Sequence, residues 1–325
     1  MKNVHLVIAD LLLPKDFAAS AGLRLPALEK IMACGKIQMY PAVSCEVLLN
    51  ELFGVHGGIA PVSAAFDGLG PGIWMRADPV HVRLQREQVV LLPDVNVSDE
   101  EAAKFCMSLN AHFTGQDMEF FAPHTNRWYV RLDVLPDIAT VPLSQASGRN
   151  IHGNLPAGAD ERRWRQLFNE IQMLLFAHPV NEAREAQGDL PVNSLWFWGE
   201  GRGGQASSPF SHASSDEVLT EMLSSSAGIP FKLWQPEWRS ENGDELLVFT
   251  GLRSSLQRGD ILAWRAALQN FETGYAKPLL QALRQGRISR LNLDILGGDQ
   301  LYRCSLERMD AWAFWRGSCR LDEVV

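Results

Sequence analysis

The sequence predicts an α/β fold in which a mostly parallel sheet is flanked by helices. Two short, almost continuous apolar runs, residues 4–9 and 192–198, are typical of strands that are covered on both faces. Amphipathic helix patterns alternate with strand patterns along the chain, as they do where helices connect parallel strands. Near the end, residues 288–296 and 300–306 flank a Gly-Gly pair, which predicts an antiparallel C-terminal hairpin.

The elements of the first half are predicted by their end signals. Pro26 opens a helix that Gly35 closes, and a second helix is expected over residues 44–54. Ser98 and Glu101 form a capping box that starts a helix reaching about His112. Alternating polar and apolar residues predict strands within the two segments 80–93 and 127–134.

The second half continues the alternation. Asp160 is expected to cap a long amphipathic helix that ends before Pro179. After the strand at 192–198 and a glycine-rich loop, Ser214 and Glu217 are expected to box the start of another helix. Strands follow at about 229–234 and 245–250, and then a helical region at 260–284 that Pro278 should kink or divide.

The chain is longer than one average domain, because it has 325 residues. We expect residues 1–83 and 157–325 to form the α/β core. Residues 84–156 are expected to form a smaller inserted α+β lobe.

Composition and charge restrict the class of protein. The formal net charge of -8 opposes nucleic acid as the main partner, because affinity for nucleic acid depends on basic side chains that neutralise phosphates. Five scattered cysteines without a CxxC pair indicate reduced thiols. No run approaches the ~20 apolar residues of a membrane span, and the start lacks a cleavage site, so we expect a cytoplasmic protein with no membrane partner.

A glycine pattern follows the strand at 192–198. Gly199, Gly201 and Gly204 satisfy G-x-G-x-x-G, the turn that binds dinucleotides when a helix follows directly. Here Ser207, Ser208 and Pro209 intervene, which favours another role for the loop.

Two further constellations each allow two interpretations. Arg76, Asp78 and His81 could combine an anion-binding arginine with an acid/base pair, or they could form a charged turn with its own salt bridge. Ser44 could be a nucleophile at a helix N-terminus, or an ordinary N-cap. The last third of the chain has no histidine, so it can contribute no imidazole to a metal site.

The segment HPVNEAREAQGDLPVNSLWFWGEG, at 178–201, resembles a stretch of the archaeal-type cofactor-independent phosphoglycerate mutases. Weaker similarities are GRNIHGNLPAG at 148–158, PALEKIMACGK at 26–36 and the first strand ending in Asp10. With WMRADPVH and NEIQMLLFAHPVN, the pattern is also similar to bacterial RpfE-type regulatory proteins. The resemblance covers most of residues 1–210 and little beyond.

The resemblance implies an alkaline-phosphatase-like fold with two metal ions, Mn or Zn, and a serine nucleophile. Asp10 matches the first metal-binding aspartate, and Ser44 is the nearest match to the nucleophile, although the count to Gly54 fits Cys45 as well. The remaining metal ligands, including an Asp-x-x-x-His element, are missing, because the corresponding stretch reads LLVFTGLRSSLQRGD. Asp10 would then be a remnant of the metal site.

Two functions follow from this resemblance. One is a non-catalytic regulatory protein without a resident cofactor, which binds a small phosphorylated or anionic metabolite or a protein partner. Its expected ligand-binding residues lie at the carboxyl ends of the strands and are Asp10, Arg76, Asp78, His81, Arg184 and Gly199. The alternative is an active metal-dependent phosphomutase or phosphatase that uses Ser44. Asn181, Asn193 and Trp198 could equally hold the scaffold.

Overall fold

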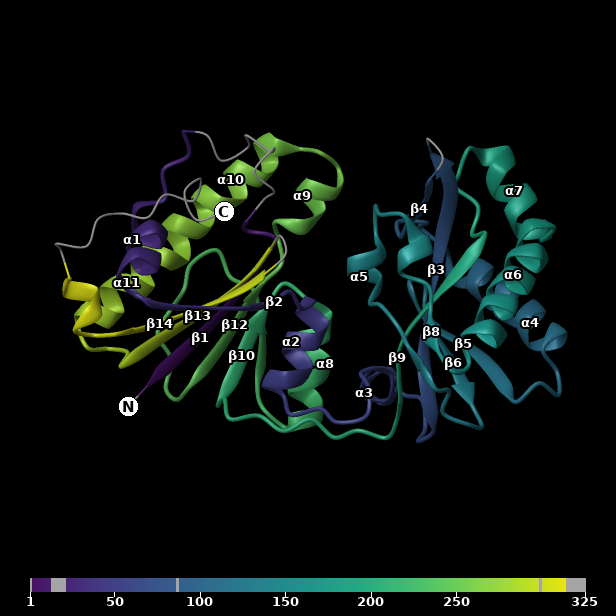
Figure 1. The fold of residues 1–325 in the computed structure, drawn as a ribbon, viewed down its shortest axis with the longest axis horizontal. Coiled ribbons are helices and arrows are strands. Elements are labelled where there is room, and N and C mark those ends of the chain that lie inside the picture. Colours follow the sequence, from purple (N-terminus) through teal and green to yellow (C-terminus); the bar gives the residue numbers. More distant parts are fainter. Residues whose placement is uncertain (1, 13–21, 86–87, 298–299, 314–325) are drawn as a thin grey trace. The chain divides into compact units, whose positions relative to one another are not determined.

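The computed structural model describes residues 2–12, 22–85, 88–297 and 300–313, which form two compact units (Figure 1). The first unit comprises Met1–Gly54 and Ala206–Val325, and the second unit comprises Val55–Gln205. The second unit is thus larger than the lobe expected at 84–156. The reason is that strands β3 and β9, on either side of the expected lobe, pair with each other.

The first unit is built on a seven-stranded sheet in the order β11-β10-β12-β1-β13-β14-β2. Neighbours from β11 to β13 are parallel, and β14 is antiparallel to both of its neighbours, β13 and β2. This confirms the predicted α/β class with a mostly parallel sheet. The strands are β1 (Asn3–Ala9), β2 (Lys36–Pro41), β10 (His212–Ser215), β11 (Phe231–Leu233), β12 (Glu245–Phe249), β13 (Arg290–Gly297) and β14 (Gln300–Glu307).

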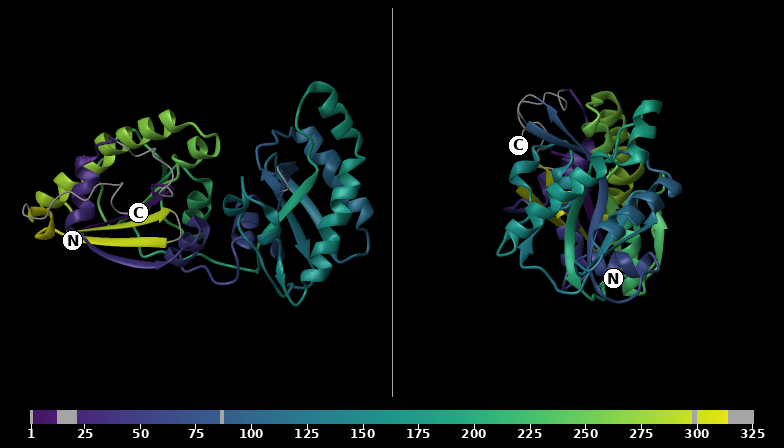
Figure 2. Two further views of the ribbon diagram at one scale, coloured as in Figure 1. Left: turned by 45° about the horizontal axis from the view of Figure 1, so that its top comes forward. Right: turned by 90° about the vertical axis from the view of Figure 1, so that its right-hand side faces the viewer.

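Helices cover both faces of this sheet. On one face, α1, α10 and α11 bury a core that includes every second residue of β1, namely Val4, Leu6 and Ile8 (Figure 2). The helices α2 and α8 lie against the other face. The helices are α1 (Pro26–Cys34), α2 (Cys45–Leu52), α8 (Val218–Ala227), α9 (Arg253–Gln257), α10 (Ile261–Phe271), the π-helical turn η3 (Glu272–Ala276), α11 (Lys277–Arg284) and the 3₁₀ turn η4 (Asp310–Trp312).

The second unit contains an antiparallel sheet in the order β4-β3-β6-β5. Strand β9 also pairs with β3, on the edge opposite to β6. A short pair, β7 with β8, lies outside this sheet. The strands are β3 (Ile73–Gln85), β4 (Gln88–Leu92), β5 (Met118–His124), β6 (Arg127–Leu132), β7 (Ile138–Ala139), β8 (Ala157–Gly158) and β9 (Ser194–Arg202). Strand β3 is long enough to pair with β6 through its first residues and with β4 through its last.

Its largest core lies between the sheet and the helices α4, α6 and α7, where Phe105, Trp128, Ile171 and Phe197 are buried. A smaller cluster packs α3 against Trp74 and Tyr129. The helices are α3 (Ala60–Phe66), α4 (Asp99–His112), α5 (Leu143–Ala146), the 3₁₀ turn η2 (Ile151–Gly153), α6 (Glu161–Phe176) and α7 (Pro179–Gln187).

Four local predictions differ from the structure. The Asp160 side chain makes no capping hydrogen bond to α6, because its Oδ2 accepts one from Asp137 N instead. The expected glycine loop at 199–204 continues strand β9 as far as Arg202, because this segment keeps pairing with β3 up to Ile73. Helix α8 begins at Val218, since Ser214 lies within β10 and Glu217 alone caps the helix. The lobe boundaries differ as given above. The hairpin of β13 and β14 is confirmed, although residues 298–299 of its turn lie outside the described residues.

The cysteines, expected to be reduced thiols, and the expected lack of a membrane span can be compared with the described residues. Cys34, Cys45, Cys106 and Cys304 are buried thiols, while Cys319 lies outside the described part of the chain. No helix within the described residues is long and apolar enough to cross a membrane.

Asp67 anchors the end of α3 to the sheet of the second unit. Its carboxylate accepts hydrogen bonds from Tyr129 Oη at 2.6 Å and from Arg127 Nη2 at 2.7 Å, and His124 Nε2 lies 3.2 Å away. Burial alone would raise the pKa of Asp67. The hydrogen bonds and positive charges around it outweigh burial and lower the pKa overall.

We expect Asp67→Asn to lower the free energy of unfolding at neutral pH by about 2–4 kcal/mol, because Arg127 loses its buried counter-charge. A lowered pKa stabilises the folded state above the unfolded-state pKa of about 4, and this stability is lost as the pH falls through the lower folded-state pKa. The variant should therefore lose less stability than the wild type between neutral pH and about pH 3. Urea unfolding at several pH values measures this, and parallel pH profiles would contradict it.

Candidate functional site

Asp10 follows β1 in the first unit, at the carboxyl ends of the parallel strands. It has a φ angle of 59°, which is rare for a residue other than glycine. Its N–H donates to Leu296 O at 2.8 Å, and its own carbonyl accepts a bond from Trp264 Nε1 at 3.3 Å. Strained backbone of this kind is concentrated at functional sites, where the surrounding structure holds it in place.

Arg253, at the start of α9 after β12, lies beside Asp10. Its Nε is 3.2 Å from Asp10 Oδ2, and its Nη1 is 4.0 Å from Glu46 Oε1 on α2. Burial alone would lower the pKa of Arg253, but the carboxyl groups of Glu46, Asp10 and Glu217 raise it overall. The guanidinium is therefore a permanent positive charge among these acids.

Asp216 and Glu217 extend the cluster from the end of β10. Asp216 Oδ1 accepts hydrogen bonds from Thr250 N at 2.8 Å and Thr250 Oγ1 at 3.1 Å, which joins the ends of β10 and β12. Desolvation by the surrounding protein raises the pKa of both carboxyl groups, although Asp216 is exposed and Glu217 is half-buried. Carboxyl groups with raised pKa values are common at functional sites, so this cluster is our candidate site.

Ser44 and Cys45 begin α2 next to Glu46. Ser44 Oγ accepts a hydrogen bond from Val47 N at 3.1 Å, so the serine caps the helix, as one of its two predicted interpretations requires. Burial, together with the charge of Glu46, raises the pKa of the Cys45 thiol far above its usual value. A thiol that stays protonated is a weak nucleophile.

The residues of the first unit do not fit the two-metal centre that the resemblance implies. The unit has two histidines, and neither lies at Asp10. His5 bonds with Asp294 at 3.1 Å, while His212 begins β10, at the end of the strand opposite to Asp216. In the described ranges, no group of three His, Cys, Asp or Glu side chains is arranged to hold a metal ion.

Of the expected ligand-binding residues, Asp10 lies in the first unit and all the others lie in the second unit. Arg76 and Asp78 form a buried ion pair, with Arg76 Nη2 2.6 Å from Asp78 Oδ1. The Arg76 guanidinium lies 5.2 Å from the ring centroids of both Tyr129 and Trp198, its cross-strand neighbours. Trp198 Nε1 donates to Asp78 Oδ2 at 2.7 Å. The predicted alternative of a charged turn with its own salt bridge is therefore correct for the salt bridge, but the pair lies in a β-sheet and not in a turn.

His81 lies apart from that pair, further along β3. Its Nδ1 is 2.9 Å from Pro191 O, and the neighbouring Val82 exchanges two hydrogen bonds with the Asn193 side chain. Asn193 therefore holds the segment before β9 against β3. The structure does not bring His81 into contact with Asp78 as an acid/base pair.

Gly199 and Gly201 are required by close packing within the second unit. Gly199 has a φ of 71°, and a Cβ there would lie 2.5 Å from Ile59 Cγ2. A Cβ on Gly201 would lie 1.5 Å from Gly57 O. The glycines thus let the chain before α3 lie against β9, which is a structural role other than dinucleotide binding.

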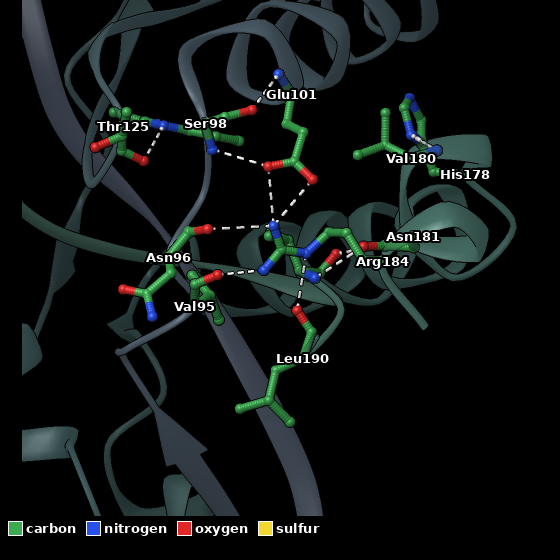
Figure 3. A network of polar contacts seen from close by, with 12 residues as sticks. Val95, Asn96, Ser98, Glu101, Thr125, His178, Val180, Asn181, Arg184 and Leu190 are labelled. Atoms are coloured by element: carbon green, nitrogen blue, oxygen red, sulfur yellow. Dashed lines mark hydrogen bonds and ion pairs between the residues drawn. The ribbon is translucent and has the colours of Figure 1, made fainter. Parts of the chain in front are cut away.

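Arg184 is at the centre of a network of polar contacts that ties α7 to the start of α4 (Figure 3). Its Nε donates to Leu190 O at 2.9 Å, and its Nη1 lies 2.9 Å from Glu101 Oε2 and 3.3 Å from Asn96 O. Its Nη2 donates to Val95 O. Arg184 is 3% exposed, so the protein itself uses nearly all of its donors.

The segment that carries the resemblance is used in the same way (Figure 3). His178 caps α7 by accepting a bond from Val180 N at 3.2 Å, and its other ring nitrogen is 2.9 Å from Ser108 Oγ. The Asn181 side chain bonds both the N–H and the carbonyl of Val192. Together with the bonds of Asn193 to Val82 and of Trp198 to Asp78, these contacts agree with the interpretation that Asn181, Asn193 and Trp198 hold the scaffold.

Four residues of the candidate site were not predicted: Glu46, Asp216, Glu217 and Arg253. Glu217 was read as a capping residue, which it is, but its second role depends on the parallel pairing of β10 with β12. Arg253 lies in the stretch where the resemblance required an Asp-x-x-x-His element. That missing element was the one sequence signal that could have pointed to Arg253.

Comparison with known proteins gives distant similarity. No family model matches the chain. The 2,3-bisphosphoglycerate-independent phosphoglycerate mutase of Methanosarcina barkeri is 24% identical over 194 residues, which are 54% of this chain and 48% of that protein. The probable enzyme of this type from Geobacter sulfurreducens is 37% identical over 65 residues, 20% of this chain and 16% of that protein. The matches to the Methanosarcina proteins thus span about half of those relatives' length.

Two solved structures are also similar. A cofactor-independent phosphoglycerate mutase from Thermoplasma acidophilum has a TM-score of 0.45 and 15% identity, with 94% of this chain and 90% of that chain covered. A protein from Pyrococcus horikoshii has a TM-score of 0.49 and 13% identity, with 99% and 89% covered. From the sequence comparisons, the curated relatives of this chain are cofactor-independent phosphoglycerate mutases at low identity, as the sequence motif predicted.

Proposed function

We propose that this chain is a phosphoglycerate-mutase-like protein that has lost the catalytic metal centre and acts in a non-catalytic, regulatory role in the cytoplasm. The resemblance of WMRADPVH and NEIQMLLFAHPVN to stretches of RpfE-type regulatory proteins supports that role. The observation that carries the proposal is the pairing of Arg253 with Asp10 at 3.2 Å, at the carboxyl ends of β12 and β1. An arginine there supplies positive charge where the resemblance implies a metal ligand.

An arginine in place of a metal ligand changes what the site can do chemically, and not only its charge. A metal ion lowers the pKa of bound water and polarises a phosphoryl oxygen through direct coordination. A guanidinium offers hydrogen bonds and a single positive charge, and it coordinates no water. Arg253 can therefore neutralise Asp10 and stabilise the fold of this corner, but it is a poor replacement for two metals in phosphoryl transfer.

Charge also bears on the ligand. Three carboxyl groups, those of Asp10, Glu46 and Glu217, act on the single guanidinium of Arg253. An excess of acidic groups disfavours an anion, because like charges repel in a partly buried site. We therefore do not place the phosphorylated or anionic metabolite expected from the sequence at this cluster, and the regulatory role is assigned to a protein partner or to a ligand that binds elsewhere on the chain.

The proposal is tested by elemental analysis of the purified protein, together with a phosphoglycerate mutase assay with added manganese or zinc. We expect less than stoichiometric metal and no turnover above the protein-free control. Ser44→Ala should lower the free energy of unfolding by about 0.5–2 kcal/mol through the lost N-cap. It should leave the assay unchanged.

Ser98→Ala is the matched control, because Ser98 caps α4 in the same way but lies in the second unit. Both variants should be destabilised to a similar extent. Stoichiometric metal with turnover that Ser44→Ala abolishes and Ser98→Ala preserves would instead establish the alternative, an active metal-dependent phosphomutase or phosphatase with a serine nucleophile.

A further inference from the structure

A pocket in the first unit lies away from the candidate site. It has a volume of about 460 Å³ and is lined by residues of β10, β11 and β12 and of the segment that joins β11 to β12. His212 and Glu245, the first residues of β10 and β12, are register partners in its wall. Because Asp216 follows the other end of β10, the pocket and the candidate site lie at opposite ends of this strand.

A buried polar group in this pocket has no hydrogen bond. The side chain of His212 is 7% exposed, and its Nε2 makes no hydrogen bond among the described residues. Glu245 Oε1 lies 3.5 Å away and Glu241 Oε2 lies 3.8 Å away, close enough for charge interaction but not placed for a hydrogen bond. A ligand oxygen at this nitrogen would supply the close hydrogen bond that the two carboxylates do not make.

The two glutamates are held in place through their other oxygens. Glu245 Oε2 accepts a bond from Trp238 Nε1 at 3.1 Å and lies 3.2 Å from Lys2 Nζ. Glu241 Oε1 pairs with Lys232 Nζ at 2.5 Å. One oxygen of each carboxylate is thus directed to a lysine, while the oxygen that faces His212 keeps acceptor capacity.

The charges around the pocket balance. Glu237, Glu241 and Glu245 line it together with Lys232 and Arg239, and Lys2 pairs with Glu245 from outside the lining. With Lys2 counted, three acidic and three basic side chains surround the pocket and give no net charge, which favours neither an anion nor a cation. Its unused capacity consists of carboxylate acceptors beside an imidazole nitrogen, which can donate or accept.

Hydroxyl groups fit this lining, because each can donate to a carboxylate and accept from an imidazole or an ammonium group. Leu247, Pro236 and Tyr275 add apolar surface to the same pocket. Its volume lies within the range of roughly 300–1,000 Å³ that is usual for small-molecule sites. We infer that this pocket binds a small, uncharged, polyhydroxylated ligand of the monosaccharide class, which bonds to His212, Glu241 and Glu245.

The test is titration of the full chain with glucose, galactose and mannose, followed by tryptophan fluorescence and by ligand-observed saturation-transfer NMR. Trp238 lines the pocket and reports on its occupancy. At least one of the three sugars should bind saturably. Glu241→Gln, which keeps the shape of the side chain but weakens its acceptor, should reduce the affinity about tenfold, the loss of roughly one charge-assisted hydrogen bond.

Glu307→Gln is the matched control. Glu307 pairs with Arg290 at 2.6 Å on the surface of the same unit, as Glu241 pairs with Lys232, but it lies outside the pocket lining. This variant should bind the sugar like the wild type. The inference is overturned if none of the sugars binds, if both variants bind equally well, or if putrescine or zinc saturates the site while the sugars do not.

Discussion

Replacing Asp78 with alanine is expected to lower the free energy of unfolding by about 3–5 kcal/mol, one of the two largest effects we predict for a single side chain. Asp78 is 1% exposed and pairs with the buried Arg76. Without it, the guanidinium stays charged between the rings of Tyr129 and Trp198 and loses its ion-pair partner. Trp198 Nε1 loses its acceptor as well.

Urea unfolding of the full chain measures the loss of stability, and hydrogen exchange of β3 and β9 locates it in the second unit. Asp133→Ala is the control, because Asp133 is an exposed aspartate of the same unit. Its effect should stay within about 0.5 kcal/mol.

Arg76→Met combined with Asp78→Ala should be more stable than Asp78→Ala alone, since removing the unpaired charge restores part of the lost stability. A loss below about 1 kcal/mol for Asp78→Ala would show that the ion pair contributes little and that Arg76 is available for another role.

The local elements were predicted where short-range chemistry determines them. The capping box of Ser98 and Glu101 placed the start of α4 correctly, and both of its hydrogen bonds are present. Pro26 and Gly35 placed both ends of α1. Pro278 lies in the first turn of α11, directly after a π-helical turn, so the regular α-helix is interrupted near the predicted place, although residues 261–284 stay helical throughout. In each case, the signal lies within a few residues of the element that it defines.

The assignment of β9 shows where such signals fail. Its apolar run, LWFW, is buried on both faces, which the sequence indicated correctly. A buried run of this kind is typical of parallel strands, yet β9 pairs antiparallel with β3 alone. Helix α6 covers β9 on one side, and α3 packs against it as well, so helices and not further strands supply the burial. Which elements cover a strand is decided by tertiary packing, which periodicity does not encode.

The candidate site was predicted in part for a similar reason. Asp10 was found because a carboxylate directly after a buried first strand is visible in the sequence. Arg253 was not, because its role depends on the parallel pairing of β1 with β12, which brings residues 243 positions apart to 3.2 Å. Arg76 was predicted to bind an anion by its type and Arg184 to bind a ligand by the resemblance, but burial in ion-pair networks gives both arginines a structural role that the sequence does not reveal.

Replacing Arg184 with methionine is expected to cost about 3–5 kcal/mol as well, although the new side chain retains most of the apolar volume. The reason is the number of groups that would lose a partner. The carbonyls of Val95, Asn96 and Leu190 and the Glu101 carboxylate all accept bonds from this one guanidinium (Figure 3). Lysine in its place should recover a minor part of the loss, because a single ammonium group does not reach acceptors on several sides at once.

Arg165→Met on α6 is the matched control, because Arg165 is half-exposed and its nearest acid, Glu161, lies 3.9 Å away. Its effect should be below about 0.5 kcal/mol. Hydrogen exchange in Arg184→Met should accelerate first in α7 and at the start of α4, the two elements that Arg184 joins, and then in the segment before β9. If Arg184→Met and Arg165→Met proved equally stable, the network would be dispensable for the fold, and Arg184 would again be a candidate for binding a ligand.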